Sequence, residues 1–221
     1  SFNQDISDWD VSSVTSMGSM FENTEDLSDD NKCYIHTSFS SNDNWEYDWD
    51  EYCSLQPFQP QTKDELQTAV DEWIDDSDSA NSTYGTIDIW DTSLITDMSD
   101  LFYYKETFNG DISDWDVSSV TDMSRMFNGA ESFNGDISGW DVSSVTDMSS
   151  MFNGAESFNG NISDWDVSSV TNMDNMFSNA ENFNQNISSW DVSSVTNMAG
   201  MFNRADSFNQ DISDWDVSSV T

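Results

Sequence analysis

The sequence repeats itself with a period of 25 residues, and this feature constrains the fold more than any other. Two aromatic series mark the period: Trp90, Trp115, Trp140, Trp165, Trp190 and Trp215, and Phe108, Phe133, Phe158, Phe183 and Phe208. Residues 1–21 carry the same pattern. A fixed period of this length predicts a solenoid, in which each coil buries its apolar side against its neighbours.

One unit, residues 108–132, reads FNGDISDWDVSSVTDMSRMFNGAES. Trp115 and Val117 alternate with polar residues, which predicts a short, half-buried strand. Ser119–Asp122 then matches a capping box, and Gly129 is placed where a helix would end in a left-handed residue. Apolar residues at helical spacing lie between them: Val120, Met123, Phe127 and Ala130. The predicted fold class is therefore an α/β solenoid with one short strand and one short helix per repeat.

The repeated pattern W-D-V-S-S-V-T-x-M-x-x-M-F-x-x-A-x-x-F-N-x-x-I resembles that of the BspA-like leucine-rich-repeat surface proteins, in their branch with 25-residue W-D-V-S-x-V-T-x-M repeats. The resemblance covers residues 1–27 and about 83–221. It implies a right-handed leucine-rich-repeat solenoid that is secreted or exposed on a cell surface and serves in adhesion or as a structural element. This chain departs from the better-known branch because methionine, phenylalanine and tryptophan take the place of leucine.

The repeat loses its register between Trp9 and Trp90, and this break divides the chain. We expect four parts: the end of a first solenoid (1–27), an acidic, disulfide-containing cap or linker (28–60), a helical N-terminal cap (61–82) and a second solenoid (83–221). The helix is predicted to start at Thr62, because Thr62–Glu65 is another capping box and an apolar stripe follows it. A cap is expected because an open end would expose the core. The alternative is an amphipathic helix that binds a partner.

Cys33 and Cys53 lie 20 residues apart in the least regular part of the chain. An isolated pair in such a segment predicts one disulfide that closes a loop, in an oxidising compartment. The alternative is two free thiols. Together with the resemblance, the disulfide favours an extracellular or cell-surface location.

The chain has 43 acidic and 5 basic residues, so its formal net charge is −38. This charge argues against binding to nucleic acid or to an anionic membrane surface, because both need lysine and arginine. No apolar run is long enough to span a bilayer.

The acidic residues make calcium a candidate cofactor, since calcium prefers oxygen ligands. The candidate metal ligands in the irregular segment are Asp43, Asp48, Asp50 and Glu51. Stacked repeats would also form columns of aspartates, for example Asp116, Asp141, Asp166, Asp191 and Asp216. The alternative is that these aspartates cap turns and form a solvated acidic surface.

We predict no catalytic residues. His36 is the only histidine, has no matched nucleophile nearby in the sequence, and is expected to be solvated. Aspartate and serine recur at fixed repeat positions, which indicates coil geometry rather than a unique site. Three sequons are candidate glycosylation sites, with chance as the alternative in a chain so rich in asparagine and serine: Asn81, Asn161 and Asn186.

Residues 1–15, SFNQDISDWDVSSVT, recur unchanged as residues 207–221. Two coils that both match the consensus would explain this, but a higher-order unit of 206 residues, itself repeated in tandem along a longer chain, explains it better. The leading hypothesis is a non-enzymatic structural segment of a long extracellular filament, whose partners are its own tandem copies. The alternative is an adhesion module that binds a glycan or a surface protein, with calcium as a candidate cofactor.

Overall fold

The computed structural model describes residues 2–4, 6–7, 9–24, 26–53 and 57–221, without the side chains of Asp30 and Glu51. The chain forms two compact units, Ser1–Pro57 (unit 1) and Phe58–Thr221 (unit 2). All described helices precede Trp90: α1 (Asp29–Phe39), α2 (Asp50–Cys53), α3 (Lys63–Asp75), α4 (Ser77–Tyr84) and the short 3-10 helix η1 (Ile87–Ile89). Within the described ranges, none of these helices has the length and apolar character needed to cross a bilayer.

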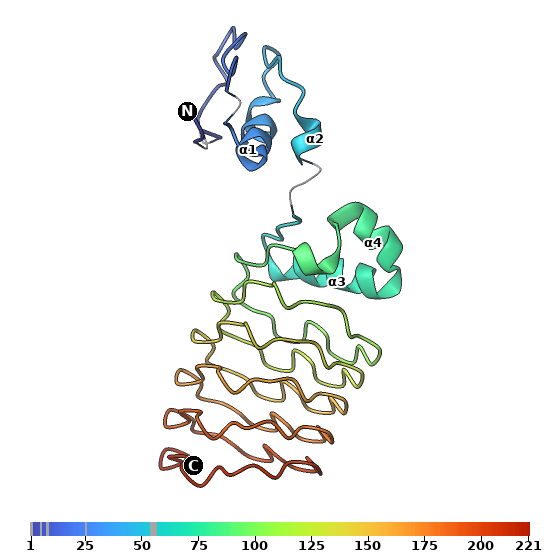
Figure 1. Ribbon diagram of the computed structural model, residues 1–221, viewed down its shortest axis with the longest axis vertical. Coiled ribbons are helices and arrows are strands. Elements are labelled where there is room, and N and C mark those ends of the chain that lie inside the picture. Colours follow the sequence, from blue (N-terminus) through green and yellow to red (C-terminus); the bar gives the residue numbers. More distant parts are fainter. Residues whose placement is uncertain (1, 5, 8, 25, 54–56) are drawn as a thin grey trace. The chain divides into compact units, whose positions relative to one another are not determined.

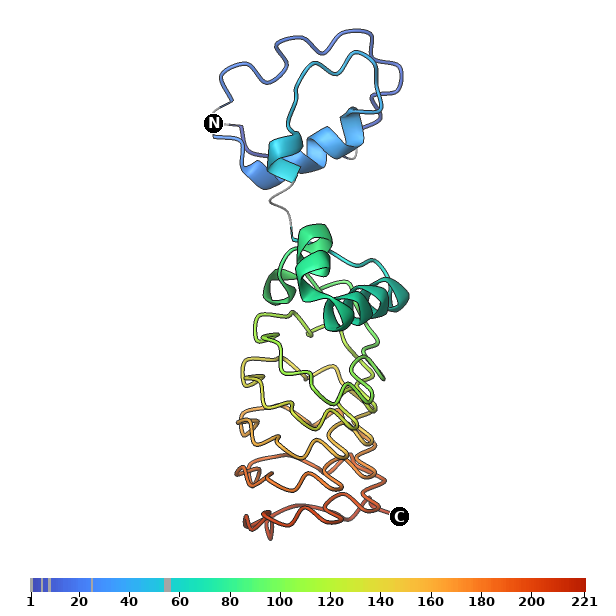
Figure 2. The ribbon, with the colours of Figure 1, turned by 90° about the vertical axis from the view of Figure 1, so that its right-hand side faces the viewer.

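From Trp90 to Thr221, unit 2 is a stack of 25-residue repeats that lie one upon the next, as both views show (Figures 1 and 2). We call each repeat of this stack a layer. Backbone hydrogen bonds join the layers: Thr146 N–H donates to the carbonyl of Thr121 (2.9 Å), and Met123 N–H donates to the carbonyl of Asp147 (3.0 Å). The sequence period of 25 is therefore the period of the contacts between layers.

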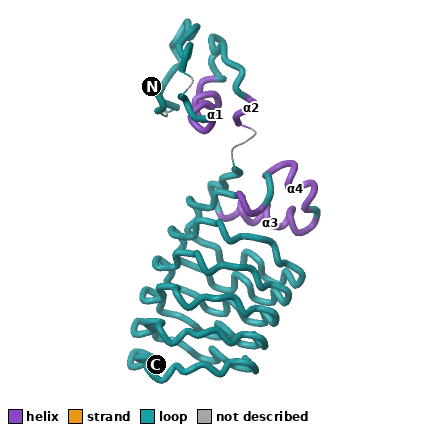
Figure 3. Tube along the Cα trace, viewed as in Figure 1, coloured by secondary structure: helices purple, strands orange, loops and turns teal. Residues whose placement is uncertain are grey.

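The predicted strand and helix of each repeat are absent from the described layers, so the leucine-rich-repeat α/β solenoid was a wrong prediction (Figure 3). The tube is loop and turn throughout the stack, and only isolated parallel bridges such as Asp97↔Asp122 join neighbouring layers. In place of the strand, Trp115 N–H donates to the carbonyl of Ile112 (3.2 Å), which closes a turn. The alternation of apolar and polar residues thus comes from a turn and not from extended pairing.

The helix fails to form because alternate backbone amides of the segment donate to another layer. In one repeat, Arg125 N–H donates to the carbonyl of Ser149 (2.8 Å) and Gly129 N–H to that of Asn153 (2.7 Å). An α-helix would need these amides to donate to carbonyls four residues earlier in the same segment. Arg125 (φ 56°) and Gly129 (φ 73°) also adopt left-handed conformations, which a right-handed helix cannot contain. The sequence correctly predicted a left-handed conformation at Gly129, but this residue belongs to a turn and not to a helix end.

The interior of the stack consists of aromatic columns. The rings of Phe127, Phe152 and Phe177 follow one another at centroid distances of 5.6 and 5.7 Å, nearly parallel. A second phenylalanine column, which includes Phe158, packs beside the first, with 4.0 Å between the Phe152 and Phe158 centroids. Buried tryptophans of the stack add bonds between layers, as Trp140 Nε1–H donates to the carbonyl of Ile112 (3.1 Å). The core is therefore continuous from layer to layer and its polar atoms are paired.

Helix α3 covers the first layer, and its start was predicted correctly. Thr62 is the N-cap, and its hydroxyl accepts a hydrogen bond from Glu65 N–H (3.2 Å). Leu66 and Val70 are fully buried in the same core as the layers. Helix α4 begins within the predicted helical cap (61–82), but no separate start was predicted for it. Asp76 instead caps α4 by accepting from Ser79 N–H (3.2 Å).

Candidate functional site

The most irregular chemistry of the chain lies in unit 1, where residues 28–53 cover the repeat formed by residues 2–27. Ser28 is the N-cap of helix α1, and its hydroxyl accepts from Asn31 N–H (3.3 Å). Its inner face buries Ile35 and Phe39 completely, in one apolar cluster with Phe21 of the repeat. This segment is therefore packed on the repeat by a core of its own.

Three aromatic residues that alternate with acidic ones continue the cover. Trp45, Tyr47 and Trp49 are half-buried around Phe21, with centroid distances of 6.0, 5.6 and 5.1 Å, whereas the acidic residues between them are exposed. Tyr47 also contributes its hydroxyl oxygen, which accepts a hydrogen bond from Phe21 N–H (2.8 Å). This contact between residues 26 positions apart was invisible to sequence reasoning.

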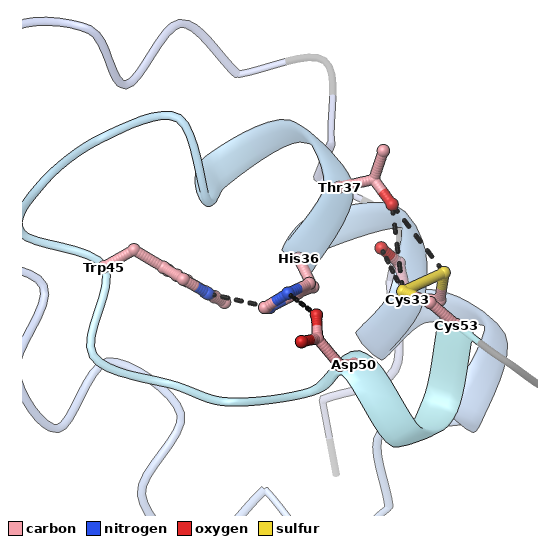
Figure 4. Close-up of a disulfide and its surroundings, with 6 residues drawn as sticks. All are labelled: Cys33, His36, Thr37, Trp45, Asp50 and Cys53. Carbon is pink, nitrogen blue, oxygen red and sulfur yellow. Dashed lines mark hydrogen bonds and ion pairs between the residues drawn. A yellow bond between two sulfur atoms is a disulfide. The ribbon is translucent and has the colours of Figure 1, made fainter.

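A disulfide joins Cys33 of α1 to Cys53 of α2, as predicted, with 4.7 Å between the Cα atoms (Figure 4). Thr37 Oγ1 lies 3.7 Å from the Cys33 sulfur and 3.8 Å from the Cys53 sulfur. The disulfide holds residues 40–53, which we call the return segment and which contain the three aromatic residues, against α1.

His36 lies beside the disulfide and joins α1 to the return segment (Figure 4). Trp45 Nε1–H donates to His36 Nδ1 (2.9 Å), and His36 Nε2 lies 2.7 Å from Asp50 Oδ1. Because Nδ1 accepts the indole proton, the imidazole carries its own proton on Nε2 and donates it to Asp50. The side chain is only 12% exposed, so the expectation of a solvated histidine was wrong. Both ring nitrogens are engaged, and neither is available to take a proton from a nucleophile.

The comparisons with known proteins identify the repeat. A family model described as "Mycoplasma protein of unknown function, DUF285" matches residues 1–48, 71–173 and 158–221. The chain belongs to the DUF285 family. Membership supports a surface repeat protein, as the resemblance implied, but not the particular branch named by it. Neither a search of curated proteins nor a search of solved structures found a match.

The predicted calcium ligands of unit 1 do not gather. Asp43, Asp48 and Asp50 are exposed, and Asp50 is engaged by His36, while the Glu51 side chain lies outside the described part of the chain. Where side chains are described, no three His, Cys, Asp or Glu residues are grouped as a metal ion would require. Calcium binding by this segment stays a prediction.

The aspartate columns of the DUF285 repeats close turns, as the alternative to calcium proposed. Asp141 Oδ1 accepts from Ser143 N–H (3.1 Å) and from Ser143 Oγ–H (2.6 Å). Asp136 accepts from Ser138 N–H in the same way (3.0 Å). At the position equivalent to Asp136, Asn161 Oδ1 accepts from Ser163 N–H (3.1 Å), so the amide closes the turn as well as the carboxylate does.

These turns give stability a pH dependence whose sign can be tested. Hydrogen bonds from Ser138 N–H and then from its side chain hold the pKa of Asp136 below its usual 3.8. A carboxyl with a lowered folded-state pKa stabilises the fold above its unfolded pKa, and this contribution is lost as the pH falls through the folded pKa. We therefore expect Asp136→Asn to leave stability at pH 7 unchanged and to make the chain more stable than wild type below about pH 3.9.

Urea denaturation at pH 7 and pH 3 measures this difference. The matched control is Asp136→Ala, which removes the acceptor and is expected to lower stability already at pH 7. An Asp136→Asn chain that loses stability at pH 7 and gains none at pH 3 would show that the carboxylate has another role.

The three sequons differ in exposure. Asn161 and Asn186 are exposed on the stack, and their Oδ1 atoms close turns, which leaves Nδ2 directed away from those hydrogen bonds. Asn81 lies in α4, half-buried, and its Oδ1 accepts from Trp73 Nε1–H (3.1 Å). Glycosylation stays a prediction at all three sequons. The exposed Asn161 and Asn186 have the better geometry for it.

Proposed function

We propose that this DUF285 chain is a non-enzymatic structural segment of an extracellular surface protein, in which units of 206 residues follow one another and form a fibre. The observation that carries the proposal is the bonding between layers. Four amides of each inner layer donate to carbonyls of the next layer: in one repeat Met123, Arg125, Phe127 and Gly129. Further amides donate backwards, as Thr146 does to Thr121.

Such a stack suits a mechanical role because equivalent layers, joined by equivalent bonds, follow one another along one direction. Each layer contacts only its neighbours, so the stability of the whole is about the sum of repeat and interface contributions. The aromatic columns run through all layers, and no single layer is left with a separate core. A pulling force along the stack would therefore act on many equivalent bonds in turn.

The charge and the disulfide support an extracellular role. With a net charge of −38, neighbouring stacks repel each other, which favours solubility and opposes side-to-side clumping. The Cys33–Cys53 disulfide is typical of oxidising compartments, outside the reducing cytosol. The family also supports a surface location.

The tandem arrangement is supported by sequence and by local structure. Residues 1–15 and 207–221 are identical in sequence, and described residues of the two segments form the same turn. Trp9 N–H donates to the carbonyl of Ile6 (3.0 Å), as Trp215 N–H donates to that of Ile212 (3.2 Å). The same sequence thus forms the same repeat in both units.

One surface feature favours the alternative, an adhesion module. Tyr103 and Tyr104 are exposed side by side, with 4.4 Å between their centroids, at positions where the other repeats of the stack have no aromatic residue. Arg125 lies over Tyr103 at 6.0 Å. The Tyr104 ring can take this position because residue 129 is glycine. A Cβ on residue 129 would lie 2.7 Å from the ring. Exposed aromatic faces beside a guanidinium suit the ring of a sugar.

Stretching of single molecules, combined with a glycan-binding assay, separates the two functions. A structural segment is expected to resist force along the stack and to show no saturable binding to an array of glycans, with or without calcium. Saturable binding that is lost in Tyr104→Ala and kept in the distant Ser194→Ala would overturn the structural assignment in favour of adhesion.

A further inference from the structure

The layer of residues 197–221 has a face that the inner layers do not show. In the layer before it, Asn175 N–H donates to the carbonyl of Ala199 (2.8 Å) and Phe177 N–H to that of Met201 (2.9 Å). The equivalent amides of the 197–221 layer donate to no backbone carbonyl among the described residues: Met198, Gly200, Phe202 and Arg204. Four donors in a row therefore point out of the stack.

Apolar side chains surround these donors. Val217 is 50% exposed, whereas Val192, its equivalent one layer earlier, is 1% exposed. A groove on this face is lined chiefly by Met198, Met201, Phe202, Ile212, Trp215 and Val217. We call this surface, with its four amides, the open face. Donors in a row within an apolar surface are what one layer presents to the next.

Unit 1 contains the same layer with this face covered. Residues 2–27 reproduce the turns of the stack: Ser19 (φ 59°) and Asn23 (φ 62°) take the left-handed positions of Arg125 and Gly129. Ser28 N–H donates to Asn3 Oδ1 (2.9 Å), the contact that links asparagines of successive layers in unit 2. Unit 1 therefore shows how a DUF285 layer is closed.

At Phe21 the cover supplies the acceptor that a following layer would supply. Phe21 is the equivalent of Phe202, and its amide donates to Tyr47 Oη instead of to a carbonyl (2.8 Å). Asn42 Nδ2–H donates to the carbonyls of Val11 (2.7 Å) and Val14 (3.0 Å). Helix α1 and the aromatic residues of the return segment cover the apolar surface.

The other side of the unit 1 layer complements the open face. Trp9 is 58% exposed, whereas its equivalents inside the stack are buried. Four carbonyls have no backbone donor among the described residues: Ser16, Gly18, Met20 and Glu22. They are equivalent to Asp122, Ser124, Met126 and Asn128, which accept from the preceding layer.

We propose that the open face of unit 2 is a docking surface for residues 16–53 of a second copy of this sequence. The register is the one in which Thr221 takes the place of Thr15, because residues 207–221 and 1–15 are identical. The carbonyls of residues 16, 18, 20 and 22 accept from the four free amides, and the disulfide-bonded segment then closes the stack. The proposal rests on the tandem arrangement proposed above. It identifies the contact by which the last layer of one copy is covered by residues of the next copy.

The test extends the full chain with a copy of residues 16–57 joined after Thr221. Amide hydrogen exchange is measured for the 197–221 layer, and free thiols are counted. In the extended chain, the amides of Met198 and Phe202 are expected to exchange about 100-fold more slowly than in the unextended chain, because exchange then requires opening of a packed layer. The added cysteines are expected to be oxidised as a pair, in a monomer.

A substitution on the open face provides the matched comparison. Val217→Asp is expected to leave the unextended chain folded, because Val217 is half-exposed, and to abolish the added protection in the extended chain. Ser219→Asp brings the same charge to an exposed position and is expected to keep the protection. Unchanged exchange on extension, or protection that survives Val217→Asp, would overturn the docking surface. Such a failure would leave the force and glycan results, which test the structural function, unaffected.

Discussion

Replacing Phe152 with alanine is expected to lower the free energy of unfolding of unit 2 by about 3–5 kcal/mol. Phe152 is fully buried, and its ring stacks on those of Phe127, Phe158 and Phe177. Its removal leaves a cavity that a turn-rich backbone, bonded to layers on both sides, cannot close. The loss interrupts the aromatic column in the middle of the stack.

Urea denaturation of the full chain, followed by tryptophan fluorescence, measures this effect. The matched control is the same substitution at Phe202, whose ring stacks on those of Phe177 and Phe208. Because Phe202 is only partly buried, its loss is expected to cost clearly less. Equal costs at the two positions would contradict a core that is built by stacking.

Loss of the disulfide, through Cys33→Ser together with Cys53→Ser, is expected to destabilise unit 1 by about 3 kcal/mol, the value for a loop of some 20 residues. Unit 1 comprises only Ser1–Pro57, and its core is one small apolar cluster. A domain of this size has little stability to spare. We therefore expect unit 1 to unfold at a much lower temperature while unit 2 is unchanged.

Calorimetry of the full chain tests this expectation through two separate transitions. Reduction of the wild-type disulfide serves as the control and is expected to reproduce the shift of the unit 1 transition. A simultaneous downward shift of the unit 2 transition would show that the two units do not unfold independently, and an unshifted unit 1 would show that the disulfide is not what holds α1 to the return segment.

The spacing of large apolar residues was sufficient to predict the period of the contacts and the buried positions. Phe127, Phe158 and Trp140 all lie in the core, as the period of 25 required. Local conformation was not predictable in the same way, because a turn and a strand both place alternate residues inside. The left-handed positions carry residues as different as Arg125, Ser150 and Asn175, so composition gave no warning of the turns that replace the helix.

The site in unit 1 was only partly predictable for a related reason. The disulfide followed from the spacing of Cys33 and Cys53, and the start of α3 from the capping box at Thr62. The roles of His36 and Tyr47 depend on partners brought together by tertiary packing. A usable signal was the alternation of Trp45, Tyr47 and Trp49 with acidic residues, which indicated an inward face but not what it covers.

The structural role is tested most directly by stretching the full chain along the stack with a single-molecule force probe. If layers joined at every 25 residues carry the load, unit 2 is expected to resist and then lengthen in multiples of about 90 Å, the extended length of one repeat, at a force that Phe152→Ala reduces. A chain that extends smoothly without such resistance, or whose resistance is unchanged by Phe152→Ala, would contradict a load-carrying stack.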